Sequence, residues 1–193
     1  MAPSNEKLNC SMDGTTVMQP CFQATQAWCW ATSISELAFF YNTTSRTEEC
    51  AAIECAVVST DLKQQCCPKG ASMKCDWHGA RDATEIARTA NAFIPGRNFV
   101  AVDEPLSEKE LVAVLMAGNP LVMGMQWQGS SGGHAKAIGG CRAGAFGSVE
   151  YAVHDPESKS WEWHPYQMVL KDGYLTWVNT VYDHGHAMPL AHS

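Results

Sequence analysis

The chain has 193 residues, of which 46% are hydrophobic, and a formal net charge of -7. This length suits one domain with a real core, or two lobes that share an interface. The negative charge gives no support to nucleic acid or an anionic membrane as a partner. No apolar run approaches the roughly 20 residues that are needed to span a bilayer.

The N-terminal residues 1–7 lack the apolar segment of a secretory signal peptide. Only 28 residues precede Cys29, so we expect no folded pro-segment in this chain. Nine cysteines nevertheless favour an oxidising destination. Export by a dedicated secretion system would explain how a chain without a signal peptide reaches an oxidising destination.

The first half of the sequence predicts helices, because apolar residues recur there at helical spacing or follow capping-box patterns. The predicted helices run from Cys29 to Tyr41, from the capping box at 45–48 to Val57, over 82–93, and from the capping box at 107–110 to a stop at Gly118.

The second half predicts strands, which glycine and proline clusters separate. The predicted strands are 121–127, 134–141, 148–155 and 174–182. Helices first and strands later indicate an α+β architecture rather than alternating βαβ units. We expect the active site in the cleft between the helical part and the sheet.

Cys29 is the candidate nucleophile of this chain. A thiol in the first turn of a helix lies near unpaired backbone N–H groups and the positive end of the helix dipole. Both features favour the thiolate, which is the reactive form of cysteine.

His134 and Asp155 are the candidates for the groups that would assist this thiolate. His134 follows Gly132 and Gly133 and precedes an apolar strand, and histidine can take and return a proton near neutral pH. Asp155 ends the next predicted strand, where its carboxylate could orient an imidazole.

Three motifs together resemble the papain-like cysteine peptidases: Gln23 ahead of Cys29-Trp30-Ala31, Gly132-Gly133-His134-Ala135, and His154-Asp155-Pro156. The likeness is strongest to the compact bacterial branch, which includes bacteriocin-processing and secreted effector peptidases, and it spans most of residues 20–180. It implies a papain-like two-lobe fold in a single domain over 1–193. The helical lobe would cover about 20–118 and the sheet lobe about 119–183, followed by a short polar tail at 184–193.

The resemblance also implies a role for each site residue. Cys29 would be the nucleophile, His134 the base and acid, and Asp155 the group that orients the imidazole. The Gln23 side chain and the Cys29 backbone N–H would form the oxyanion hole. Gln26 is a rival for this last role, but its position three residues before Cys29 suits the loop beside the cleft better. No cofactor and no metal are expected.

The implied function is a cysteine endopeptidase that cleaves a protein substrate through a thioester acyl-enzyme. We further expect a bacterial toxin or effector that is delivered into another cell and acts in the target cytoplasm, with a cognate inhibitor or immunity protein in the producer. Two alternatives stay open: a transglutaminase or glutamine deamidase with the same triad, and a non-catalytic binding module on the same fold.

The eight cysteines other than Cys29 could pair in about 105 ways. Disulfides are the first interpretation and free buried thiols the second. Zinc is the third, because the spacing of Cys66, Cys67, Cys75 and His78 lacks paired C-x2-C knuckles. We expect the tryptophans at 161, 163 and 177 in the core, where one of them could shield the His134–Asp155 pair from water.

Overall fold

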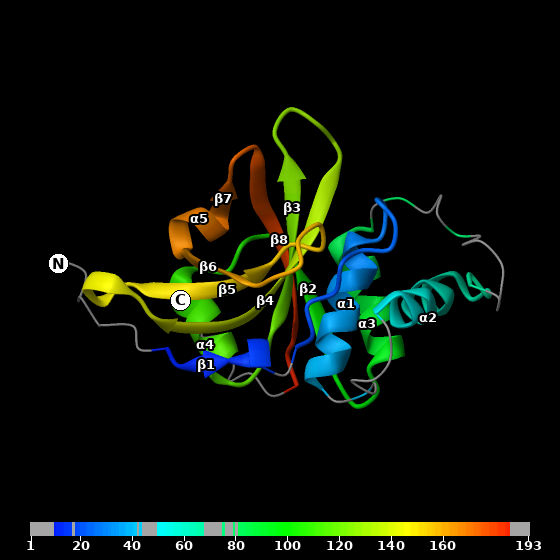
Figure 1. Ribbon diagram of the computed structural model, residues 1–193, viewed down its shortest axis with the longest axis horizontal. Coiled ribbons are helices and arrows are strands. Elements are labelled where there is room, and N and C mark those ends of the chain that lie inside the picture. Colours follow the sequence, from blue (N-terminus) through cyan, green and yellow to red (C-terminus); the bar gives the residue numbers. More distant parts are fainter. Residues whose placement is uncertain are drawn as a thin grey trace.

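The computed structural model describes residues 10–16, 18–41, 43, 50–67, 75, 79 and 81–185 (Figure 1). The helices are α1 (Cys29–Phe40), α2 (Cys50–Leu62), α3 (Ala83–Phe93), α4 (Glu108–Met116) and α5 (Tyr166–Leu170), with short 3-10 turns at Gly14–Thr16 and Ala145–Gly147. The strands are β1 (Met12–Asp13), β2 (Phe99–Val102), β3 (Leu121–Trp127), β4 (Gly133–Ala143), β5 (Val149–His154), β6 (Glu162–Pro165), β7 (Lys171–Asp172) and β8 (Leu175–Asp183).

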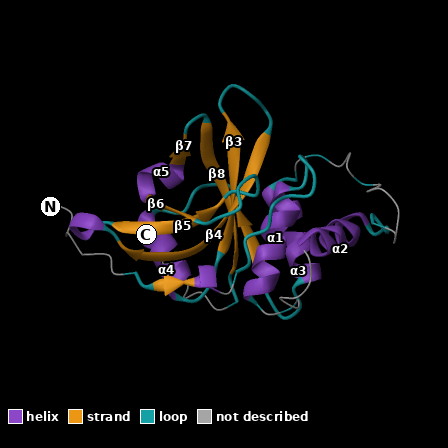
Figure 2. Ribbon diagram, in the orientation of Figure 1, coloured by secondary structure: helices purple, strands orange, loops and turns teal. Residues whose placement is uncertain are grey.

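The strands form one antiparallel sheet in the order β2-β8-β3-β4-β5-β6, with β1 added to β4 and β7 added to β8. Figure 1 shows α1, α2 and α3 grouped on one side of this sheet and α4 and α5 on the other. The secondary-structure colouring of Figure 2 makes the same arrangement visible, with the strands between the two groups of helices.

Each face of the sheet has its own apolar core, because neighbouring residues of a strand point to opposite faces. Val122 packs in the cluster that contains α1, α2 and α3. Leu121 and Met123, on either side of it, pack in the second cluster with α4. Mixed helices and strands with a curled antiparallel sheet confirm the α+β class.

Helix α1 is the most deeply buried element of the molecule. Its residues from Cys29 to Phe39 are all buried, so it has no polar face in contact with water. A helix held on all sides gives a fixed position to the residue at its start, which is Cys29.

The helices and strands predicted from periodicity agree with the structure to within a few residues. The capping box at Ser107 and Glu110 is present, and Gly118 follows the end of α4 with a positive φ of 80°. The predicted capping box at 45–48 lies outside the described residues. Five short elements were not predicted: β1, β2, β6, β7 and α5.

The boundary between the two predicted lobes, near residue 118, stays a prediction. β2 lies before this boundary and nevertheless pairs with β8 along its whole length. α4 also precedes the boundary and packs in the cluster of the sheet's second face. Both elements therefore belong with the sheet although the chain places them in the helical half.

All cysteines other than Cys29 lie at disulfide-bonding distance from a partner. The pairs are Cys10–Cys141, Cys21–Cys50, Cys55–Cys67 and Cys66–Cys75. This agrees with the first interpretation of the cysteines and removes three ligands from the zinc alternative; His78 lies outside the described residues. Over the ranges given above, no helix combines the length and the apolar character that crossing a membrane requires.

Candidate active site

Cys29 is the first residue of α1, as the sequence predicted, and its thiol is free. The side chain is buried, with 8% of the residue exposed. Trp28 precedes it at the N-cap and makes no capping hydrogen bond with its side chain. The backbone N–H groups of the first turn are therefore not taken by a capping side chain and remain near the sulfur.

His134 lies on β4 opposite Met125 of β3. A Cβ atom on the neighbouring Gly133 would lie 2.7 Å from the Met125 carbonyl oxygen, so only glycine fits there. The His134 side chain is 8% exposed. Its Nε2 lies 2.7 Å from Oδ1 of Asp155, and His134 and Cys29 line the same cleft.

The surroundings of His134 favour its protonated form. Burial lowers the pKa of the imidazole, but hydrogen bonds with Asp155 and Cys29, and the charges of both groups, outweigh burial. The resulting pKa is about 9, compared with an ordinary value of 6.5. An imidazolium beside the sulfur is the state that supports a thiolate nucleophile.

Asp155 follows β5 and is held by three groups. Its Oδ1 accepts from His134 and from the backbone N–H of Glu157, and its Oδ2 lies 2.9 Å from Nζ of Lys136. Burial raises the pKa of this carboxyl group, but these contacts reverse the effect and hold the pKa below its usual value. Asp155 is therefore ionised beside the His134 ring.

Gln23 lies on the loop before α1 and is buried, with 7% exposed. Its backbone N–H donates to the carbonyl of Pro156 at 2.9 Å, and its Nε2 donates to Oε1 of Glu157 at 3.4 Å. Gln23 is thus attached to the turn that carries Asp155. Its amide does not line the cleft beside Cys29 in this structure, so the predicted oxyanion role stays a prediction.

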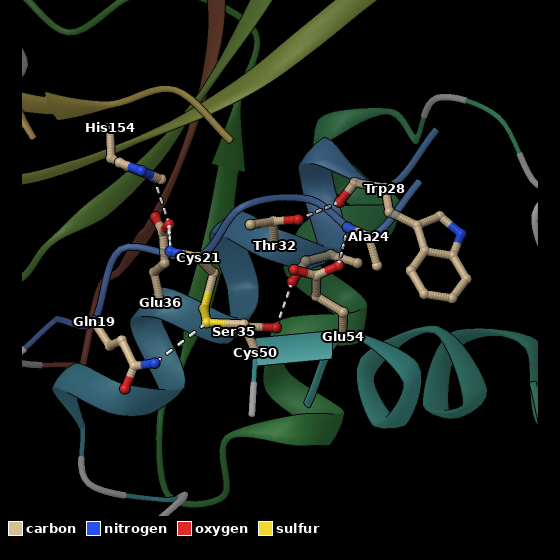
Figure 3. The surroundings of a disulfide bond; sticks show 11 residues. Gln19, Cys21, Ala24, Trp28, Thr32, Ser35, Glu36, Cys50, Glu54 and His154 are labelled. Atoms are coloured by element: carbon tan, nitrogen blue, oxygen red, sulfur yellow. Dashed lines mark hydrogen bonds and ion pairs between the residues drawn. A yellow bond between two sulfur atoms is a disulfide. The ribbon is translucent and has the colours of Figure 1, made fainter. Parts of the chain in front are cut away.

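A disulfide and a buried carboxylate hold this loop in place (Figure 3). Cys21 pairs with Cys50 at the start of α2. The backbone N–H of Ala24 donates to Oε2 of Glu54 at 2.8 Å. Burial raises the pKa of Glu54 to about 7, although the hydrogen bond from Ala24 opposes it. Gln23 lies between these two attachments.

Glu36 and His154 form a fully buried pair behind the site. Oε1 of Glu36 accepts from the Cys21 backbone N–H at 3.0 Å and lies 2.6 Å from Nδ1 of His154 (Figure 3). Burial raises the pKa of Glu36, and the contact with His154 opposes this rise. Because His154 immediately precedes Asp155, the pair connects α1 and the Cys21 loop to the end of the strand that leads into Asp155.

A cleft of about 350 Å³ opens beside Cys29 and His134. Trp30, Met125 and Ile86 give it an apolar wall, and Asn179 lies among its polar lining. Among the described residues none donates a hydrogen bond to the buried Oδ1 of Asn179.

The remaining predicted residues lie as follows. Gln26 is exposed on the loop before α1, and its predicted place beside the cleft stays a prediction. Trp177 is in the core, whereas Trp161 and Trp163 are only partly buried. Trp161 lies against His154, with ring centroids 5.3 Å apart. The Asp155 side chain keeps 29% exposure, so shielding by a tryptophan is not what the structure shows for this carboxylate.

Lys136, Glu36 and Asn179 are site residues that the sequence did not point out. Their partners lie far away along the chain, so no local pattern marks them. A lysine within an apolar strand was the one available signal for Lys136. Over the part of the chain that the structure describes, no group of three or more histidine, cysteine or acidic side chains could hold a metal ion.

A comparison with protein families identifies the family of this chain. A family model described as "Papain-like cysteine protease AvrRpt2" (Peptidase_C70) matches residues 11–167, which is most of the chain. A search among curated proteins found no match. The matched range includes Cys29, His134 and Asp155, and a protease family implies a protein substrate. The chain belongs to the papain-like cysteine protease AvrRpt2 family, and so to the cysteine-type peptidases.

Proposed function

We propose that this chain is a cysteine endopeptidase in which Cys29, His134 and Asp155 form the catalytic triad. The observation that carries the proposal is the close grouping of a free thiol, an imidazole and a carboxylate at one cleft. Cys29 and His134 line the same cleft and affect each other electrostatically, and Nε2 of His134 lies 2.7 Å from Oδ1 of Asp155. The sulfur also borders a cleft that is large enough for substrate side chains.

In this mechanism the Cys29 thiolate attacks the carbonyl carbon of the scissile peptide bond. The backbone N–H of Cys29 and the Gln23 amide stabilise the negative charge that develops on the carbonyl oxygen. His134, as imidazolium, donates its proton to the leaving amine, and a thioester forms. Water, deprotonated by His134, then hydrolyses the thioester and regenerates the thiol.

Gln23 needs a change of partner to act in this way. Its Nε2 donates to Glu157 at 3.4 Å, which is a long hydrogen bond and hence a weak one. The Glu157 side chain is exposed, so water can take the place of the Gln23 amide as its partner. Exchanging Glu157 for the oxyanion therefore costs little.

The proposed setting is a bacterial toxin or effector that is delivered into another cell. AvrRpt2-like effectors are delivered into host cells, which supports this setting. The protein would then meet its substrate in the target cytoplasm. A cognate inhibitor or immunity protein in the producing cell completes the proposal.

Terminal-labelling proteomics tests the proposed reaction directly. Active protein and Cys29→Ala are incubated with lysates of candidate target cells, and new N-termini are compared. We expect new termini with the active protein alone, at sites that share a sequence preference. Identical sets of termini from the two proteins would refute the endopeptidase proposal.

The same experiment separates peptide cleavage from amide chemistry. A transglutaminase or deamidase would use the same acyl-enzyme on a glutamine side chain, and would give a cross-link or a mass gain of about 1 Da. New termini without such changes support the peptidase. Mass changes without new termini would reassign the triad to side-chain amides.

A further inference from the structure

Lys136 is a buried cation two residues beyond His134 on β4. Its side chain is 6% exposed, and its Nζ lies 2.9 Å from Oδ2 of Asp155 and 2.6 Å from Oδ2 of Asp172. Residues two apart on a strand point to the same face. The side chains of Lys136 and His134 therefore lie on the same face of β4, and both contact Asp155.

The two oxygens of Asp155 have separate partners. Oδ1 receives Nε2 of His134 at 2.7 Å and the Glu157 backbone N–H at 2.9 Å. Oδ2 faces the Lys136 ammonium. The terminal torsion of an aspartate is broad and soft, so contacts at both oxygens are what fixes the plane of the carboxylate.

Attaching β7 does not by itself explain a buried lysine at this position. Lys136 lines a cavity of about 210 Å³ in which the apolar side chains of Met123, Val153 and Val169 lie beside acidic and polar ones. Burial opposes the charge of Lys136, but the contacts with Asp172 and Asp155 outweigh burial and raise the pKa of this lysine, so its ammonium depends on these carboxylates. The side chain of Asp172, its second partner, is 55% exposed and could be solvated without a lysine.

We infer that Lys136 is a positioning residue, whose ammonium holds Oδ2 of Asp155 so that Oδ1 stays directed at the His134 imidazole. The inference deepens the proposed function, because it rests on His134 as the acid and base and on Asp155 as the group that orients it. Lys136 touches no reacting atom itself.

Several charged or titratable groups face Asp155 from the elements around it, and any pH effect includes them all. They are His134 and Lys136 from β4, Glu157 from the turn after β5, Glu162 and His164 from β6, Asp172 from β7 and Glu36 from α1. Lys136 is the cation in contact with Oδ2.

Three explanations of Lys136 predict different changes at His134 when the ammonium is removed. If Lys136 acts only through its charge, Asp155 becomes a stronger partner and the pKa of His134 rises above about 9. If Lys136 only attaches β7, this pKa does not move. If Lys136 positions Asp155, the carboxylate turns away for part of the time, and the pKa of His134 falls towards 6.5.

The test compares Lys136→Met with Lys136→Arg and with Asp172→Asn. The pKa of His134 is measured by NMR of its ring nitrogens, and the pH profile of iodoacetamide alkylation at Cys29 is measured in the same resting proteins. For Lys136→Met we expect a lower pKa and an alkylation profile whose alkaline limb moves to lower pH. We also expect kcat on a cleaved peptide to fall by about tenfold to a hundredfold, with KM nearly unchanged.

The other two variants serve as matched controls. Lys136→Arg keeps a cation and should recover part of both the pKa and kcat. Asp172→Asn removes the partner of Lys136 that does not touch His134, and should behave like the wild type. In an Asp155→Asn background, Lys136→Met should cause little further loss, because the two residues act as a unit.

An unchanged or raised pKa of His134 in Lys136→Met would overturn the inference. The inference would also fail if Asp172→Asn shifted the pKa of His134 as far as Lys136→Met does, because the effect would then come from the attachment of β7. If Lys136→Met does not fold, Lys136→Gln takes its place under the same criteria. The resting-state measurements need no substrate, so a wild type that cleaves no protein refutes the proposed function without touching this result.

Discussion

At the scale of single residues, the ionisation of His134 is decided by its two partners. Its pKa of about 9 in the folded state exceeds the ordinary 6.5. The contacts of the imidazolium therefore contribute stability that is fully present below pH 6.5 and is lost as the pH rises through about 9. Asp155, whose pKa is lowered, behaves in the opposite way: its contribution is present above its ordinary value of 3.8 and is lost on further acidification.

We predict an alkaline limit of activity near pH 9. kcat/KM for a cleaved peptide should fall as His134 loses its proton, because the leaving amine then lacks its acid. The measurement is a pH profile of kcat/KM from initial rates. Asp155→Asn, which lacks the carboxylate charge, should move this limb to lower pH. A wild-type limb near 6.5 would contradict the assignment.

We predict that Gln23→Ala lowers kcat by about a hundredfold to a thousandfold with a smaller effect on KM. Loss of one oxyanion donor costs about 2.7–4 kcal/mol of transition-state stabilisation in other hydrolases. Gln26→Ala is the matched control, because this glutamine is exposed on the same loop. Steady-state kinetics of both variants decide the matter, and equal losses would exclude an oxyanion role for Gln23.

A candidate site residue could be predicted from the sequence where its neighbours along the chain mark it. Cys29 opens a predicted helix, and His134 and Asp155 lie beside glycines and at a strand end. The role of Lys136 was not predictable in this way, because Asp172 is 36 residues away and only the sheet brings the two together. The contact between Gln23 and Glu157 spans 134 residues and was equally hidden.

At the scale of elements, a helix or strand could be predicted where it was long enough for its pattern of apolar residues to repeat. α1, α3, α4 and the long strands show several periods of their pattern. β2 has only four residues, and its partner β8 lies about 80 residues later. A strand this short gains its stability from pairing rather than from its own sequence, so its residues gave no clear signal.

We predict that Gly133→Ala damages both stability and activity. Its Cβ would lie 2.7 Å from the Met125 carbonyl oxygen and would push β4 away from β3 beside His134. Such overpacking costs about 1–3 kcal/mol of the free energy of unfolding.

Chemical denaturation and kinetics of Gly133→Ala and Gly132→Ala give the comparison. A Cβ on Gly132 would meet only side-chain atoms, at 3.3 and 3.6 Å, so Gly132→Ala should be milder in both respects. Equal effects of the two substitutions would contradict the steric explanation.

At the scale of the whole molecule, the α+β class followed from the order of helices and strands, but the cross-links did not. Eight cysteines allow about 105 pairings, and spacing alone does not choose among them. The pairings depend on which segments the fold places side by side. Cys21 and Cys50, for example, meet because the loop before α1 lies against the start of α2 (Figure 3).

We predict that replacing Cys21 and Cys50 together by serine removes about 3–4 kcal/mol of stability. The bond closes a loop of 29 residues, for which the chain-entropy model gives this amount. kcat should fall as well, because the loop that carries Gln23 loses one of its two attachments.

The control is the double replacement of Cys55 and Cys67 by serine, which opens a bond with a separation of 12 residues. It should lower the free energy of unfolding while kcat stays near the wild-type value. Denaturation curves and kinetics of both double variants provide the measurement. A kcat loss that is equal in the two would show that the Cys21 bond has no special relation to the site.

The Cys10–Cys141 bond has a consequence for how the protein is made. Its partners are 131 residues apart in the sequence. At a synthesis rate of 5–20 residues per second, Cys10 leaves the ribosome roughly 7 to 26 s before Cys141, and all the other thiols emerge in between. In an oxidising environment, the thiols that emerge first could therefore pair before their native partners are available. The yield of correctly bonded protein should rise when a disulfide isomerase is co-produced.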